Sequence, residues 1–194
     1  MSESTIKIAS AGDEAGLISV ITLAFSTDPM ARWSQPDPNR YLEMFPPLVK
    51  AFGGKAFSEG TAYFADGYAG AALWLPPGVS SDEEAMICLI EGNAPESIKS
   101  DLYGVFEQMD KHHPKEPHWY LPLIGVDPMR QGNGVGSALM KHAVAACDSD
   151  GTIAYLESSN PRNISLYERY GFEVVGKIQS GSSPTVRPML RKPR

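Results

Sequence analysis

The sequence has few cysteines, a deficit of positive charge and no long apolar run, and each shortage excludes a class of protein. The two cysteines, Cys88 and Cys147, are too few for a disulfide framework, so we expect buried free thiols within helices. Lysine and arginine number 17 against 23 acidic residues, a net charge of -6, whereas nucleic-acid binding needs a basic face. No apolar run approaches the roughly 20 residues of a membrane span, and the N-terminus has no signal-peptide pattern. We therefore expect a cytoplasmic protein with neither nucleic acid nor membrane as its partner.

The hydrophobic content of 42% over 194 residues is typical of one soluble globular domain. Apolar spacing and helix-breaking residues divide it into an N-terminal half, about 1–113, and a C-terminal half, about 114–194. In the first half we expect a strand at 5–9, a helix at 15–25, a breaker-rich segment at 27–38, a helix from 39 that Pro46 and Pro47 interrupt, a hairpin at 61–75 and two helices within 80–113.

The second half alternates strands and helices. We expect strands at 118–126, 153–157, 172–178 and 186–190, with helices at 132–147 and 161–170. The strand–helix–strand unit from 118 to 157 requires a parallel, right-handed crossover, whereas Asp66-Gly67 indicates an antiparallel hairpin. The sequence therefore predicts an α/β (α+β) fold with a mixed, mostly antiparallel central sheet flanked by helices.

A glycine-rich loop follows the predicted strand that ends at Val126. Gly132, Gly134 and Gly136 alternate with other residues within Gln131–Ser137, and a helical pattern begins at once. Small residues let the backbone approach an anion, and the first N–H groups of a helix are unpaired and carry partial positive charge. The loop therefore predicts a phosphate-binding site, with a purely structural turn as the alternative.

The loop does not match two common nucleotide-binding patterns. A P-loop needs Gly-Lys-Ser/Thr at its end, and Gly136–Ala138 contains no lysine. In the dinucleotide pattern Ser137 occupies the third glycine position, although Glu157 lies where a ribose-binding acid is expected. Pro128 and Arg130 also separate the strand from the first glycine. A dinucleotide site stays as a minor alternative.

Two motifs together resemble the GNAT superfamily of acetyltransferases. Gln131–Gly136 fits its coenzyme A loop, Q/R-x-x-G-x-G/A. Asn160–Phe172 fits N-x-x-A-x-x-L-Y-x-x-x-G-F, except that Asn163 replaces the alanine. Three further segments resemble the puromycin N-acetyltransferase branch, namely 114–119, 156–163 and 191–193. The similarity covers the C-terminal half well and the N-terminal half only in general layout.

The resemblance implies an acetyl-CoA-dependent N-acetyltransferase, an acyltransferase that moves an acetyl group to a primary amine of a small molecule by direct attack. It also implies that coenzyme A contacts the end of the strand, the glycine loop and the second motif. These positions are Ile124, Gly125, Val126, Gln131, Gly132, Asn133, Gly134, Val135, Gly136, Ser137, Asn160, Asn163 and Tyr167.

Several of these residues have a chemical reason for their role. Proline within a strand removes a ladder hydrogen bond, so Pro122 favours a break that opens a slot for pantetheine; a simple kink is the alternative. The Val126 N–H is then a candidate oxyanion donor. Tyr167 is the candidate catalytic acid, because a phenol of pKa about 10 stays protonated when a thiolate of pKa about 8.5 forms. The alternative for Tyr167 is a core aromatic residue without a catalytic role. The alternative for Asn160 is a helix N-cap without a contact to coenzyme A.

The catalytic base and the acceptor site are less specified by the sequence. Glu157, at a predicted strand end, is the candidate base, although a water chain could serve an amine that is partly neutral. We expect the acceptor to contact Asp28, Arg32 and Trp33 of the breaker-rich segment, together with Trp74 and Tyr120. We expect no metal, because the spacing of His112, His113 and His118 fits no common zinc pattern and suits a solvated loop.

Two other functions remain open at this stage. A non-catalytic acyl-CoA-binding module would keep the glycine loop without needing an acid at Tyr167. A dinucleotide-dependent oxidoreductase is the second alternative. The oligomeric state is expected to be a monomer or a homodimer.

Overall fold

A computed structural model describes residues 4–194, so the part of the N-terminal expectation that falls on residues 1–3 lies outside it. Its centre is a seven-stranded sheet of order β1-β2-β3-β4-β5-β7-β6. The strands are β1 (Ile6–Ile8), β2 (Ala62–Ala65), β3 (Gly70–Leu75), β4 (Trp119–Val126), β5 (Ala154–Ser158), β6 (Phe172–Val174) and β7 (Arg187–Arg191). Among the strand pairs of the described chain, β4 and β5 alone run parallel. The mixed, mostly antiparallel sheet that the sequence predicts is confirmed.

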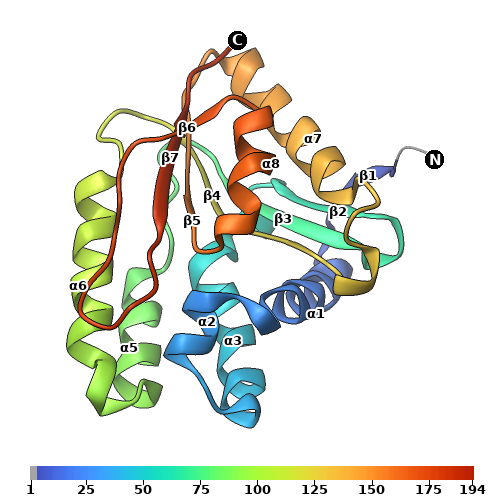
Figure 1. The fold of residues 1–194 in the computed structure, drawn as a ribbon. Helices are drawn as coiled ribbons and strands as arrows, with labels where there is room; N and C mark the ends of the chain where they lie inside the picture. The colour runs from blue at the N-terminus through green and yellow to red at the C-terminus, as the bar shows by residue number, and fades with distance from the viewer. Residues whose placement is uncertain (1–3) are drawn as a thin grey trace.

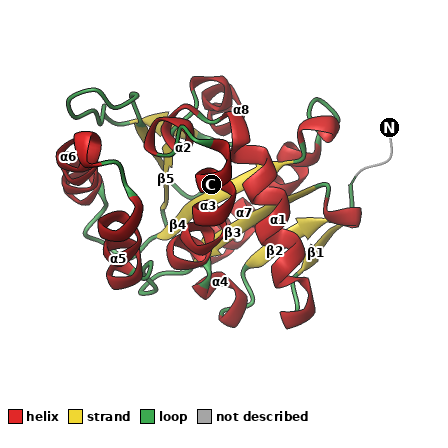
Figure 2. Cartoon of the chain, turned by 90° about the horizontal axis from the view of Figure 1, so that it is seen from below, coloured by secondary structure: helices red, strands yellow, loops and turns green. Residues whose placement is uncertain are grey.

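Helices cover both faces of this sheet (Figure 1). They are α1 (Glu14–Ala24), α2 (Pro29–Ser34), α3 (Pro38–Gly53), α4 (Lys55–Ser58), α5 (Glu83–Asn93), α6 (Glu96–His112), α7 (Val135–Asp150) and α8 (Ile164–Arg169). Because side chains alternate along a strand, Leu73 faces α1 and α3, whereas Trp74 faces α7. Figure 2 shows α1 and α3 lying across the sheet, with the α5–α6 pair to one side.

The helix α3 corrects one expectation from the sequence. Pro46 and Pro47 do not interrupt it, and the helix runs continuously from Pro38 to Gly53. The two missing N–H groups would have bonded the carbonyls of Leu42 and Glu43, which belong to exposed residues that water can satisfy. Buried residues on the opposite side hold the helix against the core, namely Tyr41, Phe45 and Val49.

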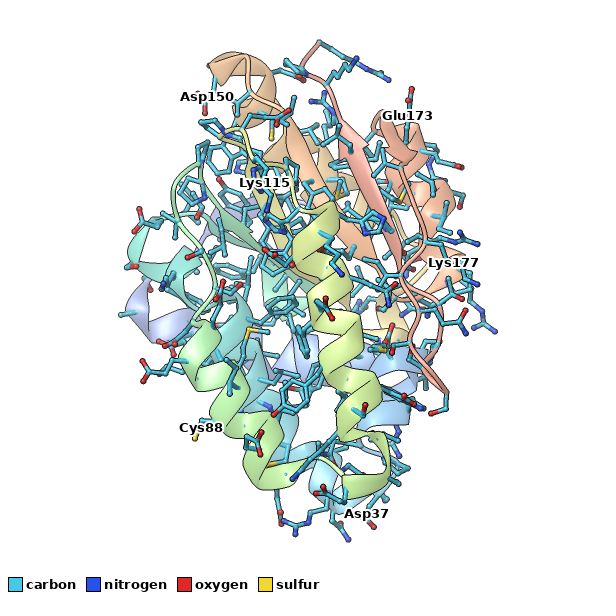
Figure 3. All side chains as sticks on the ribbon, turned by 90° about the vertical axis from the view of Figure 1, so that its left-hand side faces the viewer. Asp37, Cys88, Lys115, Asp150, Glu173 and Lys177 are labelled. Atoms are coloured by element: carbon cyan, nitrogen blue, oxygen red, sulfur yellow. The ribbon has the colours of Figure 1, made fainter. Side chains whose placement is uncertain are left out.

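Other differences from the predicted elements are local. The helix α7 begins at Val135 rather than at residue 132, because Gly132 and Gly134 have left-handed φ angles of 78° and 82°. The strand β6 ends at Val174 rather than at residue 178, whereas β7 has the predicted length and is displaced by one residue. An isolated bridge joins Ile178 to Val186. Cys147 is buried as expected, whereas Cys88 is exposed and projects from α5 (Figure 3).

The parallel strands β4 and β5 separate in the middle of the sheet. Their pairing covers only Trp119–Leu121 with Ala154–Leu156 and stops before Pro122. At the same place the register of β4 with β3 shifts: Leu73 pairs with Leu123, but Leu75 pairs with Tyr120. One extra residue therefore bulges from β4 beside the proline, which has no N–H to offer a partner strand. The two strands are separated as the proline suggests.

The segment between β6 and β7 runs down beside α6 (Figure 1). Gln108 of α6 bonds Gln179 twice, accepting from its N–H at 3.2 Å and donating to its carbonyl at 2.9 Å. The Ser182 hydroxyl and N–H both donate to Asp101 of the same helix, at 2.9 and 2.8 Å. The segment between β6 and β7 and the helix α6 are therefore held together as one unit.

Candidate active site

A first cavity, of about 510 Å³, opens between the end of β4, the glycine loop and the turn that precedes α8. All the predicted coenzyme-contacting positions except Asn133 line it. Three arginines that the sequence analysis did not select also line it, namely Arg130, Arg162 and Arg169. Their position beside the two motifs could have indicated them in the sequence, because anion sites commonly combine backbone N–H groups with guanidinium groups.

The glycine loop presents its backbone to this cavity. Gly134 caps α7, and its carbonyl accepts the helix's first hydrogen bond from the Ala138 N–H at 2.9 Å. The N–H groups of the three preceding residues, 135–137, therefore point out of the helix end. A Cβ at Gly132 or Gly134 would meet no atom within 4 Å, so these positions favour glycine for their φ angles rather than for space.

The edge of β4 beyond Pro122 faces the slot. The Asp127 N–H donates to the Ala69 carbonyl of the neighbouring chain segment at 3.0 Å. Because backbone groups alternate along a strand, the N–H groups of Ile124 and Val126 point away from β3 and into the slot. The Gln131 side-chain amide approaches the Val126 carbonyl at 3.4 Å. Backbone donors are thus available where a carbonyl group could lie.

Tyr167 lies where this cavity meets a second one. Its side chain is 5% exposed, and burial raises the pKa of its phenol above the usual range. The nearby charge of Asp28 adds to this rise in pKa, whereas a hydrogen bond with Asn163 opposes it. The phenol is therefore held in its protonated form. Tyr170 has a different position, because its hydroxyl donates to the Ser137 carbonyl at 2.7 Å and ties α8 to α7.

Asp28 joins the N-terminal half to the turn after β5. One carboxylate oxygen accepts from the N–H groups of Met30 and Ala31 and caps α2, at 2.9 and 3.1 Å. The other oxygen accepts from the Ser159 hydroxyl at 2.7 Å. Burial raises the pKa of this carboxyl, and the three hydrogen bonds oppose the rise. Asp28 lines both cavities.

Asn160 and Asn163 also lie at the first cavity. The Asn160 side chain accepts from the Arg162 N–H at 3.1 Å, so it acts as a cap for the short turn before α8. The side chain still lines the cavity, and the two readings of Asn160 are therefore compatible.

The second cavity, of about 190 Å³, lies between α2, α3, α5, α6 and the separated strands. Its walls are mostly apolar. It shares five residues with the first cavity: Phe25, Asp28, Ile124, Asn163 and Tyr167. The two spaces therefore meet beside the phenol of Tyr167.

Glu157 lines the second cavity and is the second carboxylate there. Its side chain is 4% exposed, and one oxygen accepts from the Tyr120 hydroxyl at 2.8 Å. Within residues 4–194 its other oxygen, Oε1, has no hydrogen-bond partner, and the nearest histidine atom is Nδ1 of His113 at 3.7 Å. Burial, followed by the Glu157 charge, raises the pKa of Tyr120.

The histidine segment differs from the solvated loop expected from the sequence. The rings of His113 and His118 pack together at 4.7 Å, and His113 also packs on Tyr120 and Tyr155. Burial lowers the pKa of His118, which favours its neutral form. The segment thus forms an aromatic backing behind Glu157 rather than a free loop.

The remaining predicted acceptor residues do not line the second cavity. Trp74 is fully buried beneath α7, Trp33 donates to the Ser182 hydroxyl at 3.3 Å, and the Arg32 guanidinium lies 5.1 Å from the centre of the Tyr41 ring. Tyr120 lies behind the cavity and holds Glu157. Contact between these side chains and an acceptor stays a prediction.

The site thus combines separated parallel strands, a glycine loop that opens a helix, and a buried tyrosine where two cavities meet. Residues 98–172 match the acetyltransferase (GNAT) family model. A Corynebacterium glutamicum structure, described as histone acetyltransferase HPA2 and related acetyltransferase, is 26% identical over 100% of this chain and 98% of that chain, with a TM-score of 0.71. The fold is thus that of GNAT acetyltransferases.

Two other comparisons set the limits of this similarity. An uncharacterized N-acetyltransferase of Schizosaccharomyces pombe is 28% identical in an alignment of 117 residues that covers 54% of this chain. The match spans 47% of that relative, so the chain accounts for about half of its length. An agmatine N-acetyltransferase mutant, 13% identical with a TM-score of 0.69 over 98% of this chain and 100% of that chain, shares the fold alone. The puromycin N-acetyltransferase branch is not confirmed by these matches. Among residues 4–194, no helix combines the length and apolarity needed to cross a bilayer.

Proposed function

We propose that the protein transfers an acetyl group from acetyl-CoA to a primary amine of a small molecule by direct attack. The observation that carries this proposal is that two cavities of different character meet at Tyr167. One is lined by a glycine loop and arginines, which suit a pyrophosphate, and the other is mostly apolar with two carboxylates, which suits an amine.

The donor side has a role for each group around the first cavity. The pyrophosphate of coenzyme A would lie on the N-terminus of α7, with the arginines around it neutralising its charge. The pantetheine arm would run along the free edge of β4 and pair with it as an added strand does. The Val126 N–H would then donate to the thioester oxygen as negative charge develops there.

The proton transfers would use the two titratable groups that the sequence singled out. The ammonium first loses one proton to solvent. As the neutral nitrogen then bonds to the carbonyl carbon, Glu157 accepts a second proton from that nitrogen, directly or through water. The carbon–sulfur bond then breaks, and Tyr167 donates its phenolic proton to the sulfur. The products are an amide and free coenzyme A, and exchange with solvent restores both groups.

An acyl-CoA-binding module without catalysis is the second candidate. It accounts for the first cavity but gives no role to the buried carboxylate of Glu157 in the second. A dinucleotide oxidoreductase is less favoured, because Glu157, the acid it would need at the ribose, lines the acceptor cavity rather than the first one.

A binding and turnover comparison tests the proposal. The purified protein is mixed with acetyl-CoA and a panel of primary amines that includes puromycin, and release of free thiol is followed. We expect thermal stabilisation by coenzyme A but not by NAD, and thiol release that depends on an amine. Stabilisation by coenzyme A with no turnover of any amine would favour the binding module, and stabilisation by NAD alone would contradict both readings.

A further inference from the structure

We infer that the acceptor is a compact cationic amine with an apolar, ring-sized body and no carboxylate, such as a phenylalkylamine. This inference rests on the proposed function and names the substrate class for the same site. Four features of the second cavity carry it: the composition of its walls, the charge at its inner end, its size and its methionines.

The walls of the second cavity are apolar side chains from three helices. They are Met44, Leu48 and Phe52 of α3, Met86, Leu89 and Ile90 of α5, and Val105, Phe106 and Met109 of α6. A guanidinium or hydroxyl group placed against these walls would lose its hydrogen bonds to water without gaining others. A hydrocarbon body would instead be stabilised by leaving water.

The polar end of this cavity is negative. Asp28 and Glu157 are both buried and both line it, whereas none of the described lysines or arginines does. The Glu157 side chain is 4% exposed, and its Oε1 atom lies 3.7 Å from Nδ1 of His113. A pair of buried carboxylates favours an incoming cationic N–H donor and disfavours a third carboxylate. An ammonium group satisfies this end, and an amino acid does not.

The size of the cavity selects a single ring or a short chain. Its volume is about 190 Å³, and an apolar cavity of about 150 Å³ is enough to bind benzene. The wall formed by α6 is fastened to the segment before β7 through Gln108–Gln179 and Asp101–Ser182.

Methionine is concentrated at this cavity. Four of the chain's eight methionines line it, namely Met30, Met44, Met86 and Met109. Methionine side chains adapt their shape to a neighbour, and their sulfur atoms make favourable contacts with aromatic rings. This composition favours an aromatic body over a linear aliphatic one.

A matched series of amines tests the inference on the full-length protein. Thiol release from acetyl-CoA is measured with phenethylamine, with L-phenylalanine, which adds a carboxylate, and with agmatine, which replaces the ring by a guanidinium. We expect kcat/KM for phenethylamine to exceed each of the others by about 10- to 100-fold. Equal or faster turnover of agmatine or L-phenylalanine would overturn the inference and leave the proposed function intact. No thiol release with any amine would overturn both.

A pair of variants on α5 links the preference to this wall. Leu89 lines the cavity and is partly exposed, whereas Ile87 is 53% exposed and does not line it. Leu89→Glu is expected to lower kcat/KM for phenethylamine by at least about tenfold and to raise the relative rate of agmatine. Ile87→Glu, the control on the same helix, is expected to change neither. Stabilisation by coenzyme A verifies that each variant is folded; equal effects of the two substitutions would contradict the inference.

Discussion

Removing one hydroxyl group from Tyr167 separates catalysis from packing. Tyr167→Phe keeps the buried ring, which lies against Phe172 at a centroid distance of 6.3 Å. Within residues 4–194 the variant loses the hydrogen bond with Asn163, so the free energy of unfolding is expected to fall by no more than about 1 kcal/mol. A general acid contributes about 10²- to 10⁴-fold to a rate, and kcat is expected to fall by that factor.

The assay pairs this variant with Tyr170→Phe, at the residue that follows the same helix. Tyr170 loses a hydrogen bond to the Ser137 carbonyl, which also costs about 1 kcal/mol, but it has no place at the junction of the cavities. Urea unfolding gives the stability of both variants, and thiol release at saturating amine gives kcat. We expect a large loss of kcat for Tyr167→Phe alone. If Tyr167→Phe retains kcat within about threefold of the parent, or if Tyr170→Phe loses as much, the assignment of Tyr167 as the acid is wrong.

Three further predictions concern stability. Burial raises the folded-state pKa of the Asp28 carboxyl. Protonation of Asp28 therefore stabilises the fold fully below the unfolded pKa of about 3.9, and this contribution is lost as pH rises through the folded pKa. Asp28→Asn, which still caps α2, should match or exceed the parent's urea midpoint at pH 7 but not at pH 3. A hydrogen bond from buried Arg191 lowers the pKa of Asp148, so ionised Asp148 stabilises the fold above its unfolded pKa. Asp148→Asn should therefore lower the free energy of unfolding by about 2–3 kcal/mol at pH 7, and by less as pH falls through the folded-state pKa. Gly134→Ala should cost about 1–2 kcal/mol in urea unfolding because of its φ of 82°, whereas Gly92→Ala, within α5 and open to solvent, should stabilise slightly; equal effects would contradict the backbone argument.

The lining of the first cavity could be predicted from the sequence because its determinants are local. Glycines at fixed spacing, a proline in a strand and a tyrosine at a fixed distance from Asn160 each have a short-range reason for their position. All but one of the predicted cofactor positions therefore line one cavity.

The acceptor side could not be predicted in the same way. Its walls come from α3, α5 and α6, whose apolar residues look like ordinary core positions in the sequence. Trp74 and Trp33 were selected as aromatic residues near breakers, but tertiary packing places Trp74 beneath α7 and bonds Trp33 to Ser182. The helix α3 continues through two prolines because the carbonyls that lose their N–H partners lie on its exposed side. Tertiary packing decides which side of the helix is exposed.

The meeting of two separately lined cavities has a consequence for the order of events. Each substrate has its own walls, and the shared residues lie at the contact point, so neither substrate must leave before the other binds. Under the proposed function, a ternary complex would be the reactive species, and no acetylated side chain would be needed to carry the group between half-reactions. Double-reciprocal rate plots for such a site intersect instead of running parallel. Free coenzyme A would compete with acetyl-CoA for its own cavity and leave the amine's cavity accessible.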